Sequence, residues 1–305
     1  MMVEQWSIRV PAQRGEEIRR GLIDEGVLDL SLKVRRDGTT LILPVTAPRE
    51  GSELCDFELL PGRQALPRHE LVGGIAIMQD RDPAGAAKIL TSRPSVHTVV
   101  YAAGEVSGEY RTREYEILAG KPTTRTEVIE YGHRFTVDLS AAYFSARLSS
   151  ERQRVLERMG DNEIVLDMFA GVGPFAITLA ARAALLVASD INPIAVRLML
   201  VNLAQNRIKN VIPVLADAHH LPACIPWRFD RIIMNLPLSG TAFLADAFQL
   251  CKHGGTIHYY SLVSREGEYL SEISDLGGEV IAERVVRSYS PGQWHAVYDV
   301  RVGKG

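Results

Sequence analysis

Three aspartates follow three apolar runs, and a glycine-rich turn lies between the first two. Asp167, Asp190 and Asp217 come within two residues of runs that predict strands, at 164–166, 185–188 and 211–215. Residues 171–176 read GVGPFA and match G-x-G-x-x-A, in which the glycines let the backbone approach a nucleotide cofactor. Asp190 stands 19 positions after Gly171, where a carboxylate can bind a ribose hydroxyl. A dinucleotide such as NAD and a nucleoside cofactor would both fit this arrangement.

Asp167 distinguishes the two cofactor classes. Its carboxylate directly precedes the turn and would repel a pyrophosphate, which binds to the partial positive charge of a helix N-terminus. The same carboxylate suits S-adenosyl-L-methionine (AdoMet), which carries a sulfonium and an ammonium group and no phosphate. We therefore expect residues 167–174 to bind AdoMet, with Asp167, Phe169, Gly171, Gly173 and Asp190 at the cofactor. The alternatives are an Asp167 that only caps the turn, and a domain that binds NAD or no cofactor.

Asp217 admits two interpretations. After the third strand of such a sheet, its carboxylate can accept a hydrogen bond from the adenine amino group of the cofactor. An aspartate at this place can equally cap the helix that follows. Spacing alone does not distinguish a cofactor-binding Asp217 from a helix cap.

The acceptor side of the site is predicted where the fourth strand ends. Residues 229–234 predict that strand, and Asn235-Leu236-Pro237 follow it. Ligands of parallel α/β sheets bind beyond the carboxyl ends of the strands, so Asn235 should face the transferred group. Its amide donates and accepts hydrogen bonds, which suits the edge of a base. Methyltransferases that act on ring nitrogens often carry Asn/Asp-Pro-Pro-aromatic here, and this run is a variant; a strand that simply ends at a proline turn is the alternative.

From about residue 135 the sequence alternates predicted strands and helices. The predicted strands are 164–166, 185–188, 211–215, 229–234 and 256–260, and the predicted helices are 174–184, 193–205 and 242–250. Such alternation predicts a parallel sheet with helices on both faces. Two strands close together, at 280–286 and 295–302, predict a closing hairpin. The expected fold class is α/β: a Rossmann-like class I methyltransferase domain with a mostly parallel seven-stranded sheet, preceded by two small α+β domains.

The two small α+β domains are read from the first 134 residues. Strands at 6–10 and 41–45 surround a helix at 14–24, and strands at 75–78 and 98–101 surround a helix at 83–90. Turn residues between 48 and 67 predict a linker there. A length of 305 residues fits two or three domains. We expect domain boundaries at 1–60, 66–134 and 135–305.

The composition is that of an ordinary globular protein, with 46% hydrophobic and 23% charged residues. No apolar run approaches the roughly 20 residues that span a bilayer, and the N-terminus lacks the pattern of a signal peptide. Cys55, Cys224 and Cys251 form no CxxC pair, which argues against a zinc site or a disulfide framework. We expect a cytoplasmic protein without a membrane segment or a metal. A net charge of −3 and a pI near 6.3 argue against nucleic-acid binding unless arginines gather on one face.

Charged residues upstream of the turn have an ordinary local explanation. Ser149 or Ser150 could cap a helix that carries Glu151 in its first turn. Arg147 and Glu151 would then form a local ion pair worth a few tenths of a kcal/mol. By the same reasoning Arg111 would be solvated surface. Without further context, none of these residues indicates chemistry.

Several runs together resemble one known family. Residues 167–175 (DMFAGVGPF) and 234–237 (MNLP) closely resemble the archaeal and eukaryotic tRNA (guanine-N1)-methyltransferases, and so do 143–147 (YFSAR), Glu151-Arg152 and 258–260 (HYY). That family modifies the guanosine at position 37, beside the anticodon. The resemblance is specific from about residue 109 onwards, weaker over 66–108, and present again over 1–50. The family usually has proline where this chain has Ala146, which could loosen the loop that carries Arg147.

The resemblance implies roles for three residues in the chemistry. Methylation at guanine N1 requires removal of the N1 proton and stabilisation of the charge that develops on O6. By resemblance, Glu151 is the general base, Arg111 faces the O6 charge and Asn235 holds the base edge. The reaction is then direct transfer, without a covalent enzyme intermediate.

The resemblance also implies a pocket and a partner. Tyr143 and Pro237 would shape the base pocket, Arg147 would support the cofactor and base pocket, and Asp217 would bind the cofactor. The partner is tRNA: domain 1–60 touches the elbow, while the catalytic domain holds the anticodon loop. Position 37 must be turned out of its stack, at a cost of a few kcal/mol, so contacts elsewhere on the tRNA are needed. We expect a monomer.

Other functions remain open at this point. A sister family, the wybutosine-pathway aminocarboxypropyl transferases, shares the glycine turn and acts on the same tRNA position, but it typically lacks Asn-Leu-Pro at the fourth strand. An NAD-dependent oxidoreductase is disfavoured by Asp167 and Asn235. A tRNA-binding module without catalysis is the remaining alternative, and loss of turnover with retained tRNA binding in a Glu151 variant would exclude it.

Overall fold

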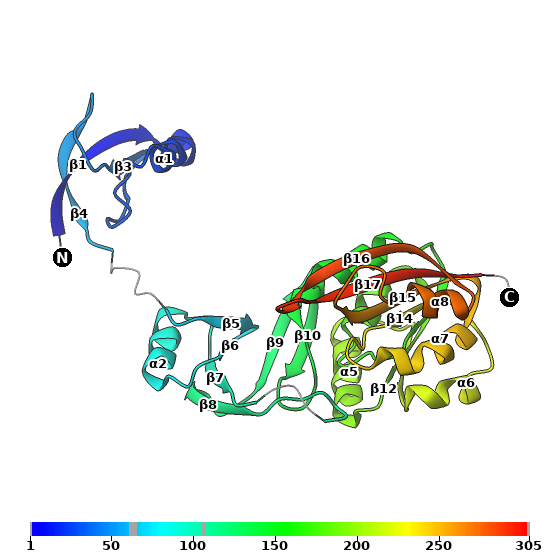
Figure 1. Ribbon diagram of the computed structural model, residues 1–305. Coiled ribbons are helices and arrows are strands. Elements are labelled where there is room, and N and C mark those ends of the chain that lie inside the picture. The colour runs from blue at the N-terminus through cyan, green and yellow to red at the C-terminus, as the bar shows by residue number, and fades with distance from the viewer. Residues whose placement is uncertain (1, 61–65, 105–107, 304–305) are drawn as a thin grey trace. The chain divides into compact units, whose positions relative to one another are not determined.

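The structure is a computed structural model that describes residues 2–60, 66–104 and 108–303 (Figure 1). The chain divides into two compact units, Met1–Leu66 and Pro67–Gly305. Each unit has its own sheets and its own hydrophobic core.

The first unit is a four-stranded antiparallel sheet with one helix. Its sheet order is β2-β3-β1-β4. The elements are β1 (Met2–Pro11), a 3-10 turn (Ala12–Arg14), α1 (Gly15–Asp24), β2 (Arg35–Asp37), β3 (Thr40–Pro44) and β4 (Glu53–Glu58). Apolar residues of β1, α1 and β3 form its core, among them Val10, Leu22 and Leu43. The predicted strands at 6–10 and 41–45 and the helix at 14–24 are confirmed, while the largely polar β2 and β4 were not predicted.

The second unit begins with a small mixed sheet and a hairpin. The sheet order is β5-β6-β7-β8, in which β6 and β7 are parallel and joined through α2. The elements are β5 (His69–Val72), β6 (Ile75–Met78), α2 (Pro83–Ser92), β7 (Thr98–Ala102), β8 (Tyr115–Gly120), β9 (Arg125–Glu130) and β10 (His133–Asp138). β9 and β10 pair only with each other among the described strands. The expected domain boundary between residues 134 and 135 falls inside β10, and the division into a middle and a catalytic domain stays a prediction.

The large sheet has seven strands in the order β13-β12-β11-β14-β15-β17-β16. The strands are β11 (Glu163–Asp167), β12 (Ala183–Asp190), β13 (Val211–Leu215), β14 (Phe229–Met234), β15 (Cys251–Val263), β16 (Gly278–Ser290) and β17 (Gln293–Val302). The first five strands in this order are parallel, and β17 is antiparallel to both β15 and β16. The expected fold class is confirmed, including the antiparallel closing pair.

Helices cover both faces of the large sheet (Figure 1). They are α3 (Ser149–Glu157), α4 (Pro174–Leu179), α5 (Pro193–Gln205), α6 (Leu221–Cys224), α7 (Leu244–Leu250) and α8 (Leu270–Asp275), with 3-10 turns at Ala146–Leu148, Ala218–His220 and Gly240–Phe243. One apolar cluster joins α3, α4 and α5 to sheet residues such as Val165 and Tyr260, and a second joins α6, α7 and α8 to Leu166 and Tyr259. Adjacent residues thus face opposite layers, because side chains alternate along a strand.

Two predictions about helix ends were wrong. The helix expected at 174–184 ends at Leu179, and β12 already begins at Ala183. Pairing of Ala183 with Glu163 on β11 decides this end, because tertiary pairing overrides the helical preference of an alanine-rich run. The cap expected from Ser149 or Ser150 is also wrong: Leu148 is the N-cap residue of α3, and no side chain caps it.

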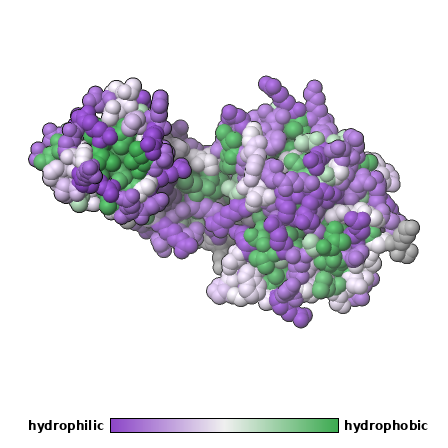
Figure 2. Space-filling view, turned by 90° about the horizontal axis from the view of Figure 1, so that it is seen from above, coloured by the Kyte–Doolittle hydropathy of each residue, from purple (hydrophilic) through white to green (hydrophobic). Residues whose placement is uncertain are grey.

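The surface is mixed in polarity. In the space-filling view, hydrophilic areas separate the apolar ones on both units (Figure 2). No helix within the described ranges is long and apolar enough to cross a membrane.

Candidate active site

The glycine turn after β11 is held by the residues of neighbouring strands. Gly171 and Gly173 both have positive φ angles, 56° and 89°, which glycine adopts without a steric penalty. The backbone N–H of Gly171 donates to Asp190 Oδ2 at 2.7 Å, and the N–H of Asn192 donates to Asp190 Oδ1 at 2.9 Å. A Cβ at position 173 would lie 2.8 Å from Met199 Cγ on α5. The turn therefore packs against α5 and holds Asp190 beside Gly171, while the cofactor contact of Asp190 stays a prediction.

Asp167 is buried at the end of β11, with 1% of its surface exposed. Neither carboxylate oxygen has a hydrogen-bond partner among the described residues. Burial, together with the negative charge of Asp190, raises the pKa of Asp167 to about 8; the backbone N–H groups of Phe169 and Ala176 and the charge of Arg152 only partly offset this. A buried carboxylate without a partner is costly. A cationic ligand would relieve that cost, so the residues present fit the sulfonium and ammonium groups of AdoMet.

An aromatic group borders the turn on the side of α7. The ring of Phe169 meets Phe243 edge-on at 5.1 Å, and His219 stacks on Phe243 at 4.0 Å. Asp217 Oδ1 accepts from the backbone N–H of His219 at 3.0 Å, so Asp217 is an N-cap residue. Capping uses this one oxygen, and the cofactor contact of Asp217 stays a prediction. Sequence reasoning missed Phe243 and His219, because nothing in their local pattern points to a site.

The loop before α3 lies against the glycine turn. Asn192, which caps α5, donates through its side chain to Ala141 O at 2.7 Å. The carbonyl oxygen of Tyr143 lies 3.5 Å from the position that a Cβ of Gly171 would occupy. Tyr143 itself is 42% exposed. The structure therefore brings the predicted pocket residue Tyr143 beside the predicted cofactor turn.

Arg152 anchors the same region from inside. Its guanidinium is buried, pairs with Glu130 at 2.6 Å and lies about 5.9 Å from the ring centres of Phe144 and Phe175. Arginine stacks on aromatic faces and forms planar pairs with carboxylates, so this residue ties α3 to β9 and α4.

Glu151 lies on the face of α3 that packs on the sheet, and 1% of its surface is exposed. Oε1 accepts from Tyr260 Oη at 2.8 Å and from Arg154 Nη2 at 2.6 Å. Oε2 accepts from Arg284 of β16. The three donors come from three different elements, so the carboxylate is oriented by the tertiary fold.

A chain of buried charged groups continues from Arg154. Arg154 also donates to Asp299 at 2.6 Å, and His258 Nδ1 contacts Asp299 at 2.6 Å. Arg231 contacts His258 Nε2 at 2.6 Å and pairs with Glu163 at 2.7 Å. Because arginine can only donate, His258 Nε2 is the acceptor and Nδ1–H donates to Asp299. Burial alone would raise the pKa of Asp299, but the hydrogen bonds of His258 and Arg154 outweigh it and hold that pKa well below the usual range.

Asn235 and Pro237 continue from β14 alongside β15. Met234 is in register with Tyr259, and the N–H of Leu262 donates to Pro237 O at 3.1 Å. The Asn235 run therefore lies beside the part of β15 that carries Tyr260. The side-chain oxygen of Asn235 is buried and has no hydrogen-bond partner among the described residues. This acceptor is available to a ligand at the carboxyl edge of the sheet.

Arg111 is not simple solvated surface. Its φ is 53°, an unusual value for a residue with a side chain, and it is half-buried. Burial lowers its pKa, with Tyr143 and Tyr289 as opposing electrostatic neighbours. Arg111 also acts electrostatically on the buried His295 of β17. The structure thus brings Arg111 toward the Tyr143 loop and the closing strand pair.

The expected ion pair between Arg147 and Glu151 is wrong. Arg147 pairs with Glu70 of β5 instead, and its side chain is 56% exposed. Glu151 is engaged by Arg154 and Arg284. Sequence proximity favoured the local pair, but the fold turns the two side chains toward different elements.

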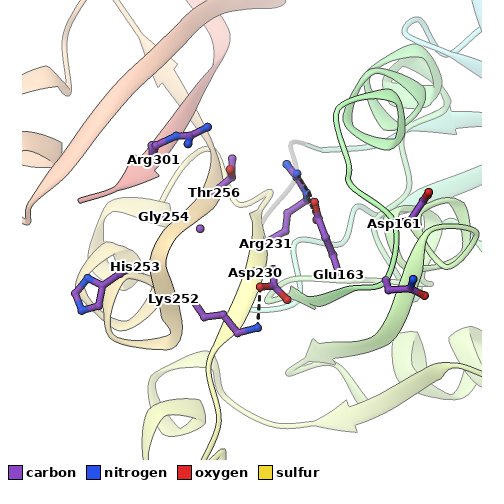
Figure 3. Close-up of a pocket in the computed structure, with 11 residues that line it drawn as sticks. Asp161, Glu163, Asp230, Arg231, Lys252, His253, Gly254, Thr256 and Arg301 are labelled. Atoms are coloured by element: carbon purple, nitrogen blue, oxygen red, sulfur yellow. Dashed lines mark hydrogen bonds and ion pairs between the residues drawn. The ribbon is translucent and has the colours of Figure 1, made fainter. Parts of the chain in front are cut away.

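A polar pocket of about 410 Å³ lies at the opposite edge of the large sheet (Figure 3). It is lined where β11 and β14 begin and where β17 ends, by Glu163, Arg231 and Arg301 among others. Its acids and bases largely pair with each other, as in Arg231–Glu163 and Lys252–Asp230. Ligands of such sheets bind at the carboxyl edge, so this pocket is not the candidate active site. Over the described part of the chain, no cluster of three or more His, Cys, Asp or Glu side chains could hold a metal ion.

A parallel five-stranded core with an antiparallel closing pair, a glycine turn after its first strand and a buried acid before that turn define a class I methyltransferase. The model of the TRM5/TYW2 methyltransferase domain matches residues 126–286, and that of the tRNA methyltransferase 5 N-terminal domain matches residues 7–53. The chain belongs to the TRM5/TYW2 methyltransferase family. The resemblance found in the sequence is confirmed.

Relatives match along nearly the whole chain. The tRNA (guanine(37)-N(1))-methyltransferase Trm5b of Pyrococcus abyssi is 37% identical over 97% of this chain and 98% of that protein, and its crystal structure gives a TM-score of 0.77 at 36% identity, covering 98% of this chain and 100% of that one. The complex of aTrm5 with tRNALeu gives 0.76 at 29% identity, with coverage of 98% and 100%. The structure of Methanocaldococcus jannaschii TYW2 with AdoMet gives 0.59 at 28% identity, covering 76% of this chain and 98% of that one.

Proposed function

We propose that this protein transfers the methyl group of AdoMet to N1 of the guanosine at position 37 of tRNA. The relatives that span both units carry this activity in their names. The observation that carries the proposal is the buried carboxylate of Glu151, oriented by Tyr260 of β15, the strand that pairs with the β14 end before Asn235-Leu236-Pro237. A base of this kind is needed because guanine N1 carries a proton at neutral pH.

The cofactor would be held around the turn after β11. AdoMet supplies an electrophilic methyl group when it is bound. Asp167 would face its positive groups, and Asp190, already fixed by Gly171, would accept from the ribose. Phe169 and Gly173 would shape the turn, and Asp217 would receive the adenine amino group.

Three residues would act on the guanine. Glu151 accepts the N1 proton, so that the electron pair of that bond stays on the ring. Arg111 stabilises the charge that this places on O6, since a guanidinium near a developing oxyanion lowers the barrier. Asn235 holds the base edge, and its buried unpaired oxygen gives the acceptor for a guanine N–H. Holding the base near the donor contributes several kcal/mol by proximity.

The remaining predicted residues would form the pocket. Tyr143 and Pro237 border the base from the loop and from the strand end. Arg147 would support this pocket through its pair with Glu70, which ties the loop to β5. The first unit would bind the tRNA elbow while the second holds the anticodon loop. We further propose a cytoplasmic monomer that requires no metal.

Methyl transfer to unmodified tRNA transcripts tests the function. Transcripts with guanosine at position 37 should be methylated at N1, and otherwise identical transcripts with another base there should not. Glu151→Gln should reduce turnover by about 10²- to 10⁴-fold without weakening tRNA binding. Full activity of that variant would exclude Glu151 as the base.

The alternative within the family is aminocarboxypropyl transfer to a modified guanosine. The nucleoside released from the cofactor separates the two reactions by mass spectrometry. S-adenosylhomocysteine means methyl transfer, and methylthioadenosine means aminocarboxypropyl transfer. The match of residues 7–53 to the tRNA methyltransferase 5 N-terminal domain favours methyl transfer.

A further inference from the structure

The two carboxylate oxygens of Glu151 are held in different ways. Oε1 accepts from Tyr260, which is fully buried, and from Arg154, whose side chain is 13% exposed and also pairs with Asp299. Oε2 accepts from Arg284, whose side chain is 52% exposed. Among the described residues, the guanidinium of Arg284 has no other hydrogen-bond partner. Oε1 is therefore anchored, while the partner of Oε2 can exchange.

Arg284 belongs to a local group of arginines on the closing strands. It lies on β16, the edge strand of the sheet, as does Arg287, which is in register with His295. His295 is buried and lies within the electrostatic reach of Arg287, Arg111 and Glu151. The guanidinium groups of Arg287 and Arg111 thus act on the same buried imidazole as the Glu151 carboxylate, which pairs with Arg284. The chain is acidic as a whole, but at this place positive charge exceeds negative charge.

The geometry creates a conflict for a general base. Tyr260 and Arg154 occupy Oε1 and cannot leave without exposing buried charge. Oε1 already accepts two N–H groups of Arg154 and the hydroxyl of Tyr260, so Oε2 is the oxygen open to a proton, and Arg284 already donates to it. The Arg284 side chain is 52% exposed, so an anion from solution can reach its guanidinium and replace Glu151 as its partner. Guanidinium groups bind phosphate oxygens in the same planar geometry as carboxylates, and a nucleotide turned into the site brings its own phosphates.

We propose that Arg284 exchanges partners when tRNA binds: it leaves Glu151 Oε2 for a backbone phosphate next to the target guanosine. This inference rests on the proposed function, because it takes Glu151 as the base. The freed Oε2 then accepts the N1 proton; the N1–H bond breaks, an Oε2–H bond forms, and the electron pair remains on the guanine. Contact between Arg284 and the RNA backbone thereby frees the Glu151 carboxylate to act as the general base.

The test is a double-mutant cycle on tRNA affinity. Dissociation constants would be measured at several salt concentrations for the wild type, Glu151→Gln, Arg284→Gln and the double variant. Glu151→Gln should tighten binding several-fold, because Arg284 no longer has to leave a carboxylate. Arg284→Gln should weaken binding and lower the slope of log affinity against log salt by about one. In the Arg284→Gln background, Glu151→Gln should no longer tighten binding.

Arg301→Gln is the matched control. It removes one exposed arginine from the partner strand β17, at the pocket on the opposite edge of the sheet. Arg284→Lys, which keeps the charge, should retain most of the salt slope, and thermal melting would show that all variants fold. The proposal is overturned if Arg284→Gln keeps the wild-type salt slope, or if Glu151→Gln tightens binding equally in both backgrounds.

Failure of this inference is distinguishable from failure of the proposed function. The double-mutant cycle measures tRNA binding alone, whereas the turnover of Glu151→Gln tests whether Glu151 is the general base. If the cycle shows no coupling and Glu151→Gln is inactive, the exchange of partners by Arg284 is excluded, while Glu151 remains the proposed general base. An active Glu151→Gln removes the base whatever the binding data are.

Discussion

Tyr260 Oη donates a hydrogen bond to Glu151 Oε1 at 2.8 Å, between residues that are 109 positions apart. Burial and the charge of Glu151 raise the pKa of Tyr260 well above its ordinary value, so the phenol stays a donor throughout the physiological range. The histidine-tyrosine-tyrosine run on β15 thus contributes to the candidate site through two residues on one face: Tyr260 directly, and His258 through Asp299 and Arg154.

The first prediction concerns this hydrogen bond. Tyr260→Phe should lower kcat by about 10- to 100-fold, because a hydrogen bond to a charged group is worth about 1.5–3 kcal/mol and each 1.4 kcal/mol is a factor of ten. KM for tRNA should not change. Tyr259→Phe is the control: this neighbour is equally buried but bonds to Thr241 and Ser261 on the other face. Equal losses of kcat in the two variants would remove the specific role of Tyr260.

The second prediction concerns proton release on cofactor binding. With a pKa of about 8, Asp167 is mostly protonated at pH 7, and a cationic ligand favours its ionised form. AdoMet binding at pH 7 should therefore release about one proton from Asp167, and affinity should rise with pH until about 8. Calorimetry in buffers of different ionisation enthalpy counts the protons. Asp167→Asn should lose this release; the same proton count in both proteins would contradict the assignment.

The third prediction concerns stability at mildly acidic pH. Burial and the charge of Arg287 lower the pKa of His295 to about 4, whereas an unfolded histidine titrates near 6.5. Between these values the unfolded chain binds a proton that the folded protein does not, so stability falls as pH falls from about 6.5 to about 4. The loss attributable to His295 is about 3 kcal/mol at most.

Urea unfolding at pH 7 and pH 4.5 checks this prediction. His295→Gln should show a shallower decline in the free energy of unfolding than the wild type. His220→Gln, which replaces an exposed histidine, should decline as the wild type does. Identical declines in all three proteins would show that His295 is not the group responsible.

The fourth prediction concerns the glycine turn. Gly173→Ala should destabilise the fold and weaken AdoMet binding, because φ is +89° and the new Cβ would meet Met199 Cγ at 2.8 Å. Gly254 offers a matched control with φ +76° and open space around it. Gly254→Ala should cost about 1–2 kcal/mol from backbone strain alone and leave AdoMet affinity unchanged. Met199→Ala in the Gly173→Ala background should recover part of the stability; no recovery would exclude the clash with Met199 as the cause.

Much of the fold could be predicted because its signals are local. Apolar runs predicted the five parallel strands. Because Asp167 and Asn235 directly follow two of these runs, their places at strand ends could also be predicted. The end of α4 was misjudged because pairing of Ala183 with β11 is not visible in the alanine-rich run itself. Strands β9 and β10 were not recognised, since each is defined by its partner.

The site was predicted unevenly for the same reason. Asp190 reaches the turn through one backbone hydrogen bond, and the spacing to Gly171 indicated it. The sequence did not indicate that Arg284 and His295 belong to the site, because their positions depend on the register of β16 and β17 with β15. The local pair of Arg147 and Glu151 was a reasonable expectation that long-range contacts replaced.

The sequence by itself determined the cofactor class, through an acid in front of a glycine turn, and it predicted where the acceptor binds, through Asn235 after the fourth strand. Only the tertiary structure decided which donors hold the carboxylate of Glu151. The turn is formed by consecutive residues, so its function depends on local sequence. Orientation of the Glu151 carboxylate instead requires contacts among α3, β15 and β16. These contacts depend on the register of the sheet strands and on burial, and neither can be predicted from one segment of the sequence.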